Sequence, residues 1–156
     1  MILIYVHKET SRIKYVFEFI FKGILGEDIE ITSDKEDYLS FEGTKLSYGK
    51  TKIFDGIFFK SVGLLTQKSI VSQQIEVFQF EQLPAFYKVY GESEMPFDPF
   101  SLSFFLVSRY EEHLPFSKDK FGRFTAKESI AYKHDFLHLP LIDLYAYKIK
   151  DIILNY

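Results

Sequence analysis

The chain opens with a hydrophobic run of strand length, residues 2–6, of the kind that is buried on both faces. Thr10 or Ser11 can cap the helix that follows, and Gly26 is placed to end it. The apolar residues of this helix recur at intervals of three and four: Ile13, Val16, Phe17, Ile20 and Ile24. Residues 28–32 then alternate in the manner of a strand. Together these segments predict a βαβ unit with parallel neighbouring strands and a right-handed crossover.

The pattern changes between residues 34 and 90, where short β-rich runs are separated by turn signals and predict mostly strands and hairpins. In the last third, Asp98 can cap a helix that has Pro99 at its first position and reaches about Glu112. A final helix starts near Pro140 and runs to the end of the chain. The sequence therefore predicts an α/β fold: a mixed sheet that begins with a βαβ unit, a hairpin-rich middle and a helical C-terminal third.

The length of 156 residues suits a single globular domain, residues 1–156, that needs no metal or disulfide to hold its core. With 18 Phe and 11 Tyr but no Trp, this core should be unusually aromatic. No Gly or Pro closes the final helix before Tyr156, so we expect the domain to be the N-terminal part of a longer chain.

Charge and cysteine usage exclude several classes of function. A net charge of −3 and a pI near 5.8 provide no basic field, which argues against a nucleic-acid binder and against an anionic membrane surface. The absence of cysteine excludes thiol catalysis, disulfides and cysteine zinc sites. No signal peptide or membrane-spanning run is present in the sequence, so we expect a cytoplasmic protein.

Two histidines have the spacing of metal ligands. In "HDFLH", His134 and His138 would share one face of a helix, and Asp135 could act as a third ligand or a base. The glutamate of the His-Glu-x-x-His pattern is missing, and Pro140 follows closely. A loop packed on the final helix explains the same residues, so the metal site is only an alternative.

A charged set in the last third gives the candidate binding or interface residues: Asp98, Arg109, Glu111, Glu112, Asp119 and Arg123. On the predicted helix Arg109 and Glu112 lie on one face, while Glu111 points elsewhere, which does not suit a catalytic carboxylate pair. We expect instead a structural network in which a partly buried Arg109 is paired with a carboxylate of its own helix or of the Asp119 loop.

Other motifs of catalysis or cofactor binding are missing from the sequence. It contains no G-x-x-x-x-G-K or G-x-G-x-x-G for nucleotide phosphates and no G-x-S-x-G for a serine nucleophile, so we expect neither a cofactor nor a catalytic residue. Surface aromatics such as Tyr87 and Tyr90 could stack on sugars, although core or edge packing is the more common role of such residues.

The C-terminal third carries a family resemblance. Its elements are "DPF" (Asp98–Phe100), "SRYEE" (Ser108–Glu112), "DKFGRF" (Asp119–Phe124), "AYKHDFL" (Ala131–Leu137) and "PLID" (Pro140–Asp143). With these motifs and the "ILIY" opening, the chain resembles the N-terminal region, a domain of unknown function, that precedes the catalytic domain in a group of bacterial polysaccharide deacetylase-like proteins.

The resemblance implies an accessory role in carbohydrate metabolism. Polysaccharide deacetylases bind a metal through one aspartate and two histidines in T-F-D-D-type and H-x-x-x-[ST]-H-type motifs, and this sequence has neither; "HDFLH" has Leu137 where Ser or Thr is needed. The implied function is a non-catalytic module that packs on, or presents glycan substrate to, a following catalytic domain of the same chain. A carbohydrate-binding module with surface aromatics and a small metal-dependent hydrolase with His134 and His138 stay open as alternatives.

Overall fold

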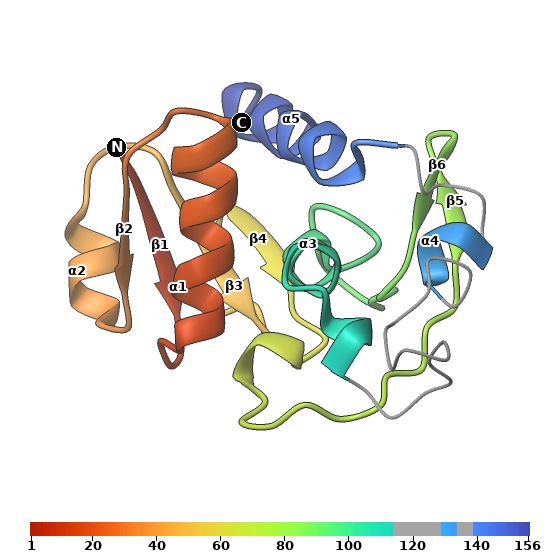
Figure 1. Ribbon diagram of the computed structural model, residues 1–156. Coiled ribbons are helices and arrows are strands. Elements are labelled where there is room, and N and C mark those ends of the chain that lie inside the picture. Colours follow the sequence, from red (N-terminus) through yellow and green to blue (C-terminus); the bar gives the residue numbers. More distant parts are fainter. Residues whose placement is uncertain (114–128, 134–138) are drawn as a thin grey trace.

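A four-stranded parallel sheet forms the centre of the fold in the computed structural model, which describes residues 1–113, 129–133 and 139–156 (Figure 1). Its strands are β1 (Ile2–Val6), β2 (Ile29–Thr32), β3 (Lys45–Gly49) and β4 (Ile57–Lys60). They lie in the order β2-β1-β3-β4, with β1 parallel to both β2 and β3 and with β3 parallel to β4. The predicted βαβ unit and the α/β class are confirmed.

The first two crossovers of the sheet, which carry helices, cover opposite faces. From β1 the chain reaches β2 through α1 (Ser11–Phe17), which continues into a π-helical segment, η1 (Glu18–Ile24). From β2 it returns past β1 to β3 through α2 (Lys35–Ser40), in the opposite direction along the sheet. Because such crossovers are right-handed, a reversal of direction places the second helix on the other face. Side chains of β1 accordingly alternate between a large core and a small one.

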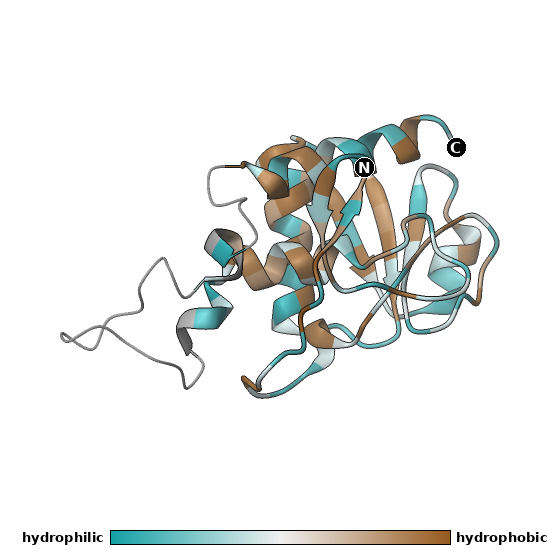
Figure 2. Ribbon diagram, turned by 90° about the vertical axis from the view of Figure 1, so that its right-hand side faces the viewer, coloured by the Kyte–Doolittle hydropathy of each residue, from teal (hydrophilic) through white to brown (hydrophobic). Residues whose placement is uncertain are grey.

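The large core lies between the sheet and three helical segments: α1 with η1, α3 (Pro99–Val107) and α5 (Leu141–Leu154). Phe100 of α3 occupies its middle, with ring centroids 4.5 Å from Phe17 and 5.3 Å from both Tyr48 and Phe59. These rings meet edge to face, the geometry that aromatic pairs prefer. Apolar positions gather on these central strands and helices in Figure 2, and the expected aromatic core is confirmed.

The middle of the chain contains one described hairpin, β5 (Phe78–Phe80) with β6 (Leu83–Ala85), after a 3-10 turn, η2 (Leu64–Thr66). Neither the helix α2 nor the parallel pairing of β3 with β4 was predicted from the sequence. Asp34 caps α2 by accepting hydrogen bonds from the backbone N–H groups of Glu36 and Asp37 at 2.8 and 3.2 Å. Buried Tyr38 anchors this short helix in the small core.

The C-terminal third is helical, as predicted, but its first helix ends earlier than Glu112. Asp98 caps α3 as expected, whereas Arg109 takes a left-handed conformation with φ 55° that interrupts the helix after Val107. A 3-10 turn, η3 (Tyr110–His113), follows, and a short helix, α4 (Ile130–Lys133), precedes α5. The prediction that Arg109 and Glu112 share a helical face is therefore wrong. Within the described residues, no helix combines the length and apolarity needed to cross a bilayer.

Candidate functional site

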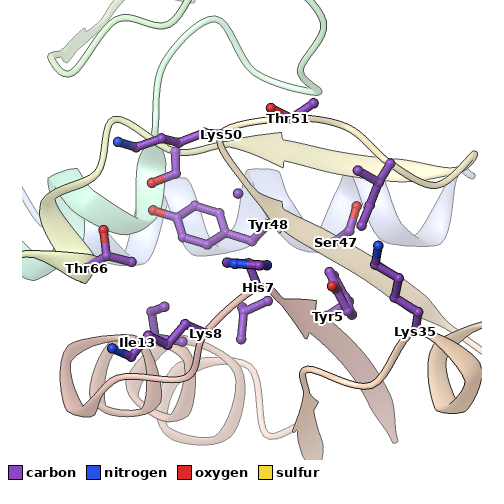
Figure 3. A pocket seen from close by; sticks show the side chains of 14 residues that line it. Tyr5, His7, Lys8, Ile13, Lys35, Ser47, Tyr48, Lys50, Thr51 and Thr66 are labelled. Atoms are coloured by element: carbon purple, nitrogen blue, oxygen red, sulfur yellow. The ribbon is translucent and has the colours of Figure 1, made fainter.

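A pocket of about 460 Å³ opens at the carboxyl ends of β1 and β3 (Figure 3). These two strands are neighbours, and the chain leaves them in opposite directions, because β2 lies beyond β1 while β4 lies beyond β3. Open α/β sheets bind their ligands at such a switch point, where diverging connections leave a crevice. The volume is within the range of small-molecule sites. The fold therefore gives this pocket a functional position.

The pocket lies over the carboxyl ends of the strands and is lined by residues from both faces of the sheet. Tyr5 of β1 is in register with Ser47 of β3, and Val6 with Tyr48. Since successive strand residues point to opposite faces, the first pair faces the α2 side and the second pair faces the α1 side. All four residues line the pocket. A ligand in this pocket would contact both sides of the sheet edge.

The charged side chains of the pocket are basic. Lys8 follows β1, Lys35 begins α2, and Lys50 follows β3, while His7 adds an imidazole. Among the described residues no Asp or Glu lines the pocket. None of the three lysines forms an ion pair with a described Asp or Glu. The whole chain has a net charge of −3, so this is a local concentration of positive charge on an acidic protein.

Ser47 supplies a buried polar group to the pocket. Its side chain is 2% exposed, and its hydroxyl lacks a hydrogen-bond partner among the residues that the structure describes. Buried hydroxyls are nearly always hydrogen-bonded, since an unpaired one is costly to desolvate. Ser47 lines the pocket, so a bound ligand could supply the missing partner.

Tyr48 forms one wall of the pocket, and the buried carboxylate of Asp98 holds its side chain in place. The Tyr48 hydroxyl donates to Asp98 Oδ2 at 2.6 Å, and the Ser101 hydroxyl donates to the same oxygen at 2.6 Å. The backbone N–H of Val62 donates to it at 3.0 Å, while Oδ1 accepts from the N–H groups of Phe100 and Ser101. This network joins β3, the segment after β4 and α3 around one side chain.

Burial sets the protonation behaviour of this pair. Asp98 is 0% exposed, and burial raises the pKa of its carboxyl, a rise that hydrogen bonds from Ser101 and Tyr48 oppose. Burial and the negative charge of Asp98 raise the pKa of Tyr48. Tyr48 is therefore a neutral hydrogen-bond donor and a rigid part of the wall.

The turn after β4 forms one rim of the pocket. Gly63 has φ +97°, a conformation that favours glycine, and its N–H donates to Ser61 Oγ at 2.9 Å. Thr66 donates its hydroxyl to the Gly63 carbonyl at 3.0 Å. A Cβ on Gly63 would lie 3.3 Å from Lys50 Cε, so the missing side chain leaves room for this lysine.

Helix α1 ties the same turn to the core. The Thr10 hydroxyl donates to the Leu65 carbonyl at 2.6 Å, and the Arg12 guanidinium donates to the Leu64 carbonyl at 2.8 Å. Arg12 also lies over the ring of Phe104 at 5.2 Å. These contacts hold the rim in place, and the sequence analysis identified neither polar residue in this role.

The structure describes only part of the charged set that was predicted as a binding or interface site. Asp98 is buried and acts as a helix cap and as the support of Tyr48. The prediction of a partly buried Arg109 is wrong, because its left-handed backbone ends α3 and its side chain is exposed. Glu111 is half-buried in η3, where Glu112 also lies. Asp119, Arg123, His134 and His138 lie outside the described residues, among which no group of His, Asp or Glu could hold a metal.

The candidate sugar-stacking tyrosines differ from each other. Tyr87 is half-buried, its hydroxyl donates to Gln73 Oε1 at 3.1 Å, and its ring packs against Phe86 and Phe105. Burial raises its pKa. Tyr90 is 73% exposed. Both line a shallow groove of about 690 Å³ beside Gln73. Tyr87 is therefore largely structural, and Tyr90 is the accessible ring.

The sequence contains a signal for the pocket in the residues that directly follow β1 and β3. His7 and Lys8 come directly after a buried first strand, at the end where ligands bind in parallel sheets. Lys50 and Thr51 come directly after β3 in the same way. Because β3 was not predicted as a parallel neighbour of β1, these positions could not be brought together.

Comparison with known proteins gives the family. The model of DUF7033, a family of unknown function, matches residues 2–156. Neither the curated proteins nor the solved structures include a match to this chain. None of these comparisons connects the domain with polysaccharide deacetylases. The match extends over nearly the whole chain, which therefore belongs to the DUF7033 family of unknown function.

Proposed function

We propose that this domain is a binding module that holds a small organic anion in the pocket at the carboxyl ends of β1 and β3. The observation that carries the proposal is the combination of three lysines with a buried Ser47 hydroxyl around one cavity at the switch point of the sheet, a hydroxyl that has no hydrogen-bond partner among the described residues. Ammonium groups attract carboxylates and phosphates, and the hydroxyl is stabilised when a ligand pairs with it.

The remaining lining suits the non-ionic part of such a ligand. Ile13 and Ile53 provide apolar surface in the pocket, and the rings of Tyr5 and Tyr48 add to it. Small-molecule sites usually combine mostly apolar walls with a few polar groups that fix orientation. Binding of an organic acid, rather than of a bare inorganic ion, uses both parts of the lining.

Isothermal titration calorimetry with hexanoate and with inorganic phosphate, at low ionic strength, tests the proposal. We expect saturable binding with one site, which the double variant Lys8→Gln/Lys50→Gln loses. The control variant Lys14→Gln/Lys22→Gln removes the same charge from exposed positions on α1 and η1, outside the pocket lining, and should bind like the parent protein. Absence of saturable binding, or equal loss in both variants, would contradict the proposal.

A second proposal follows from the family resemblance. We propose that the domain is a non-catalytic accessory region that packs against a deacetylase-like catalytic domain of the same chain. Exposed apolar side chains on α5 favour such a contact: Tyr147 is 55% exposed and Leu154 is 69% exposed. In the full-length protein, Tyr147→Ser and Leu154→Ser should separate the melting transitions of the two domains. Melting that is unchanged by both substitutions would argue against a packed interface.

The carbohydrate-binding alternative depends on Tyr90, the exposed ring beside the groove that Gln73 and Tyr87 also line. Stacking on a sugar ring would make Tyr90→Ala bind a glycan more weakly. Affinity electrophoresis through a soluble acetylated polysaccharide can measure this effect. Equal retardation of the parent protein and Tyr90→Ala would remove the alternative.

A further inference from the structure

We infer that the ligand of this pocket carries two separate acidic groups, one on each side of the sheet edge, an inference that rests on the proposed anion-binding function. The lysines do not form one cluster. Figure 3 shows Lys35 toward one end of the pocket and Lys8 and Lys50 toward the other, with His7 between them. Two cationic ends joined by a mostly apolar passage match a molecule with an acid at each end.

The first end lies on the α2 side of the sheet. Lys35 is the first residue of α2, and Ser47 is on the face of β3 that lies on the α2 side of the sheet. Asp34, the neighbour of Lys35 in sequence, accepts two backbone hydrogen bonds as the cap of α2 and does not line the pocket. An acidic group at this end could accept a hydrogen bond from Ser47 while it lies close to the Lys35 ammonium group.

The second end lies on the α1 side. Lys8 and Lys50 follow the central strands β1 and β3, and Thr66 stands on the rim formed by the turn after β4. The glycine at position 63 leaves the space that the Lys50 side chain occupies. Two ammonium groups at this end favour the stronger or more highly charged of the two acidic groups.

The order of the strands separates the two ends. Lys35 follows β2 and Lys50 follows β3, and β1 lies between these strands. Neighbouring strands are about 4.8 Å apart, so the ends of β2 and β3 are separated by about 10 Å. A chain or ring with an acid at each end can reach across this spacing and contact both lysine sets.

A series of α,ω-dicarboxylates from glutarate to azelate, each compared with the monocarboxylate of equal chain length, tests the inference by calorimetry. We expect the best dicarboxylate to bind about 1.5- to fivefold more tightly than its monocarboxylate, the gain typical of one added, exposed ion pair. Lys35→Gln should abolish this preference while monocarboxylate binding persists. Lys22→Gln, which removes one charge outside the pocket, should leave the preference intact.

The outcomes separate the two proposals. Monocarboxylates and dicarboxylates that bind equally well would overturn the inference of two acidic groups and leave the anion-binding function standing. A dicarboxylate preference that survives Lys35→Gln would also overturn it, because the second contact would lie elsewhere. If no member of the series binds, the proposed function itself fails. Phosphono-carboxylates that bind with higher affinity than dicarboxylates would support the inference and indicate a phosphorus oxyacid as one of the two acidic groups.

Discussion

Replacement of Tyr48 by phenylalanine removes a hydroxyl that donates a hydrogen bond to a buried charge. The substitution keeps the ring and its edge contacts with Phe17 and Phe100, whose centroids lie 5.4 and 5.3 Å away. It removes the hydroxyl that donates to Asp98 Oδ2 at 2.6 Å. Hydrogen bonds to charged groups contribute about 1.5 to 3 kcal/mol each. At 2 to 4 °C per kcal/mol for a domain of this size, the melting temperature should fall by roughly 3 to 12 °C.

The loss should depend on pH, because burial raises the folded-state pKa of Asp98 above its ordinary value of 3.8. The folded state then binds the proton more tightly than the unfolded state. The contribution of this group to stability is complete below the unfolded pKa and is lost as pH rises through the folded pKa. Without the Tyr48 donor the charged form is stabilised less, so the folded pKa rises further.

The difference in unfolding free energy between parent and Tyr48→Phe should therefore be largest above the folded-state pKa of Asp98 and shrink as pH falls below it, where a neutral carboxyl makes an ordinary hydrogen bond. Chemical denaturation at several pH values measures this difference. Tyr145→Phe is the matched control, because buried Tyr145 donates to the neutral carbonyl of Pro84 at 2.7 Å. Its cost, about 1 kcal/mol, should not vary over this pH range. Equal pH profiles for the two variants would refute the reasoning.

Three further substitutions address the pocket and its supports. Ser47→Ala should stabilise the free protein by up to about 1 to 3 kcal/mol in denaturant titrations, by removing a buried hydroxyl that has no partner among the described residues, and should weaken anion binding; a destabilised variant would show that the hydroxyl is satisfied. Gly63→Ala, at φ +97°, should cost about 1 to 3 kcal/mol and lower anion affinity by displacing Lys50; unchanged melting would contradict this strain. Arg12→Lys should lower stability by roughly 1 to 2 kcal/mol, because lysine cannot reproduce the guanidinium contacts that include the Leu64 carbonyl; a parent-like melting curve would count against that role.

Local signals were sufficient for several elements. The hydrophobic run of β1, the three-and-four spacing after Thr10 and the cap formed by Asp98 each identify an element from neighbouring residues alone. The start of α5 just after Pro140 follows from the same kind of reasoning. The physical reason is that hydrophobic periodicity and capping act over one or two turns of chain.

Predictions that needed long-range information were incomplete. The prediction that α3 extends to Glu112 was wrong because Arg109 takes a left-handed backbone conformation, which its residue type does not predict. The short helix α2 lies within a region whose β-rich runs favoured hairpins. Tertiary packing of Tyr38 and the Asp34 cap decide its conformation.

The sequence by itself determined the class of fold, the opening βαβ unit and the aromatic character of the core, because these depend on composition and short-range pattern. Only the tertiary structure brought Lys8, Lys35 and Lys50 around one cavity and placed the hydroxyl of Ser47 among them. The strand order β2-β1-β3-β4 brings these residues together, because β1 lies between β2 and β3, two strands that are consecutive in the chain. Such pairings join residues dozens of positions apart, and no local pattern encodes them.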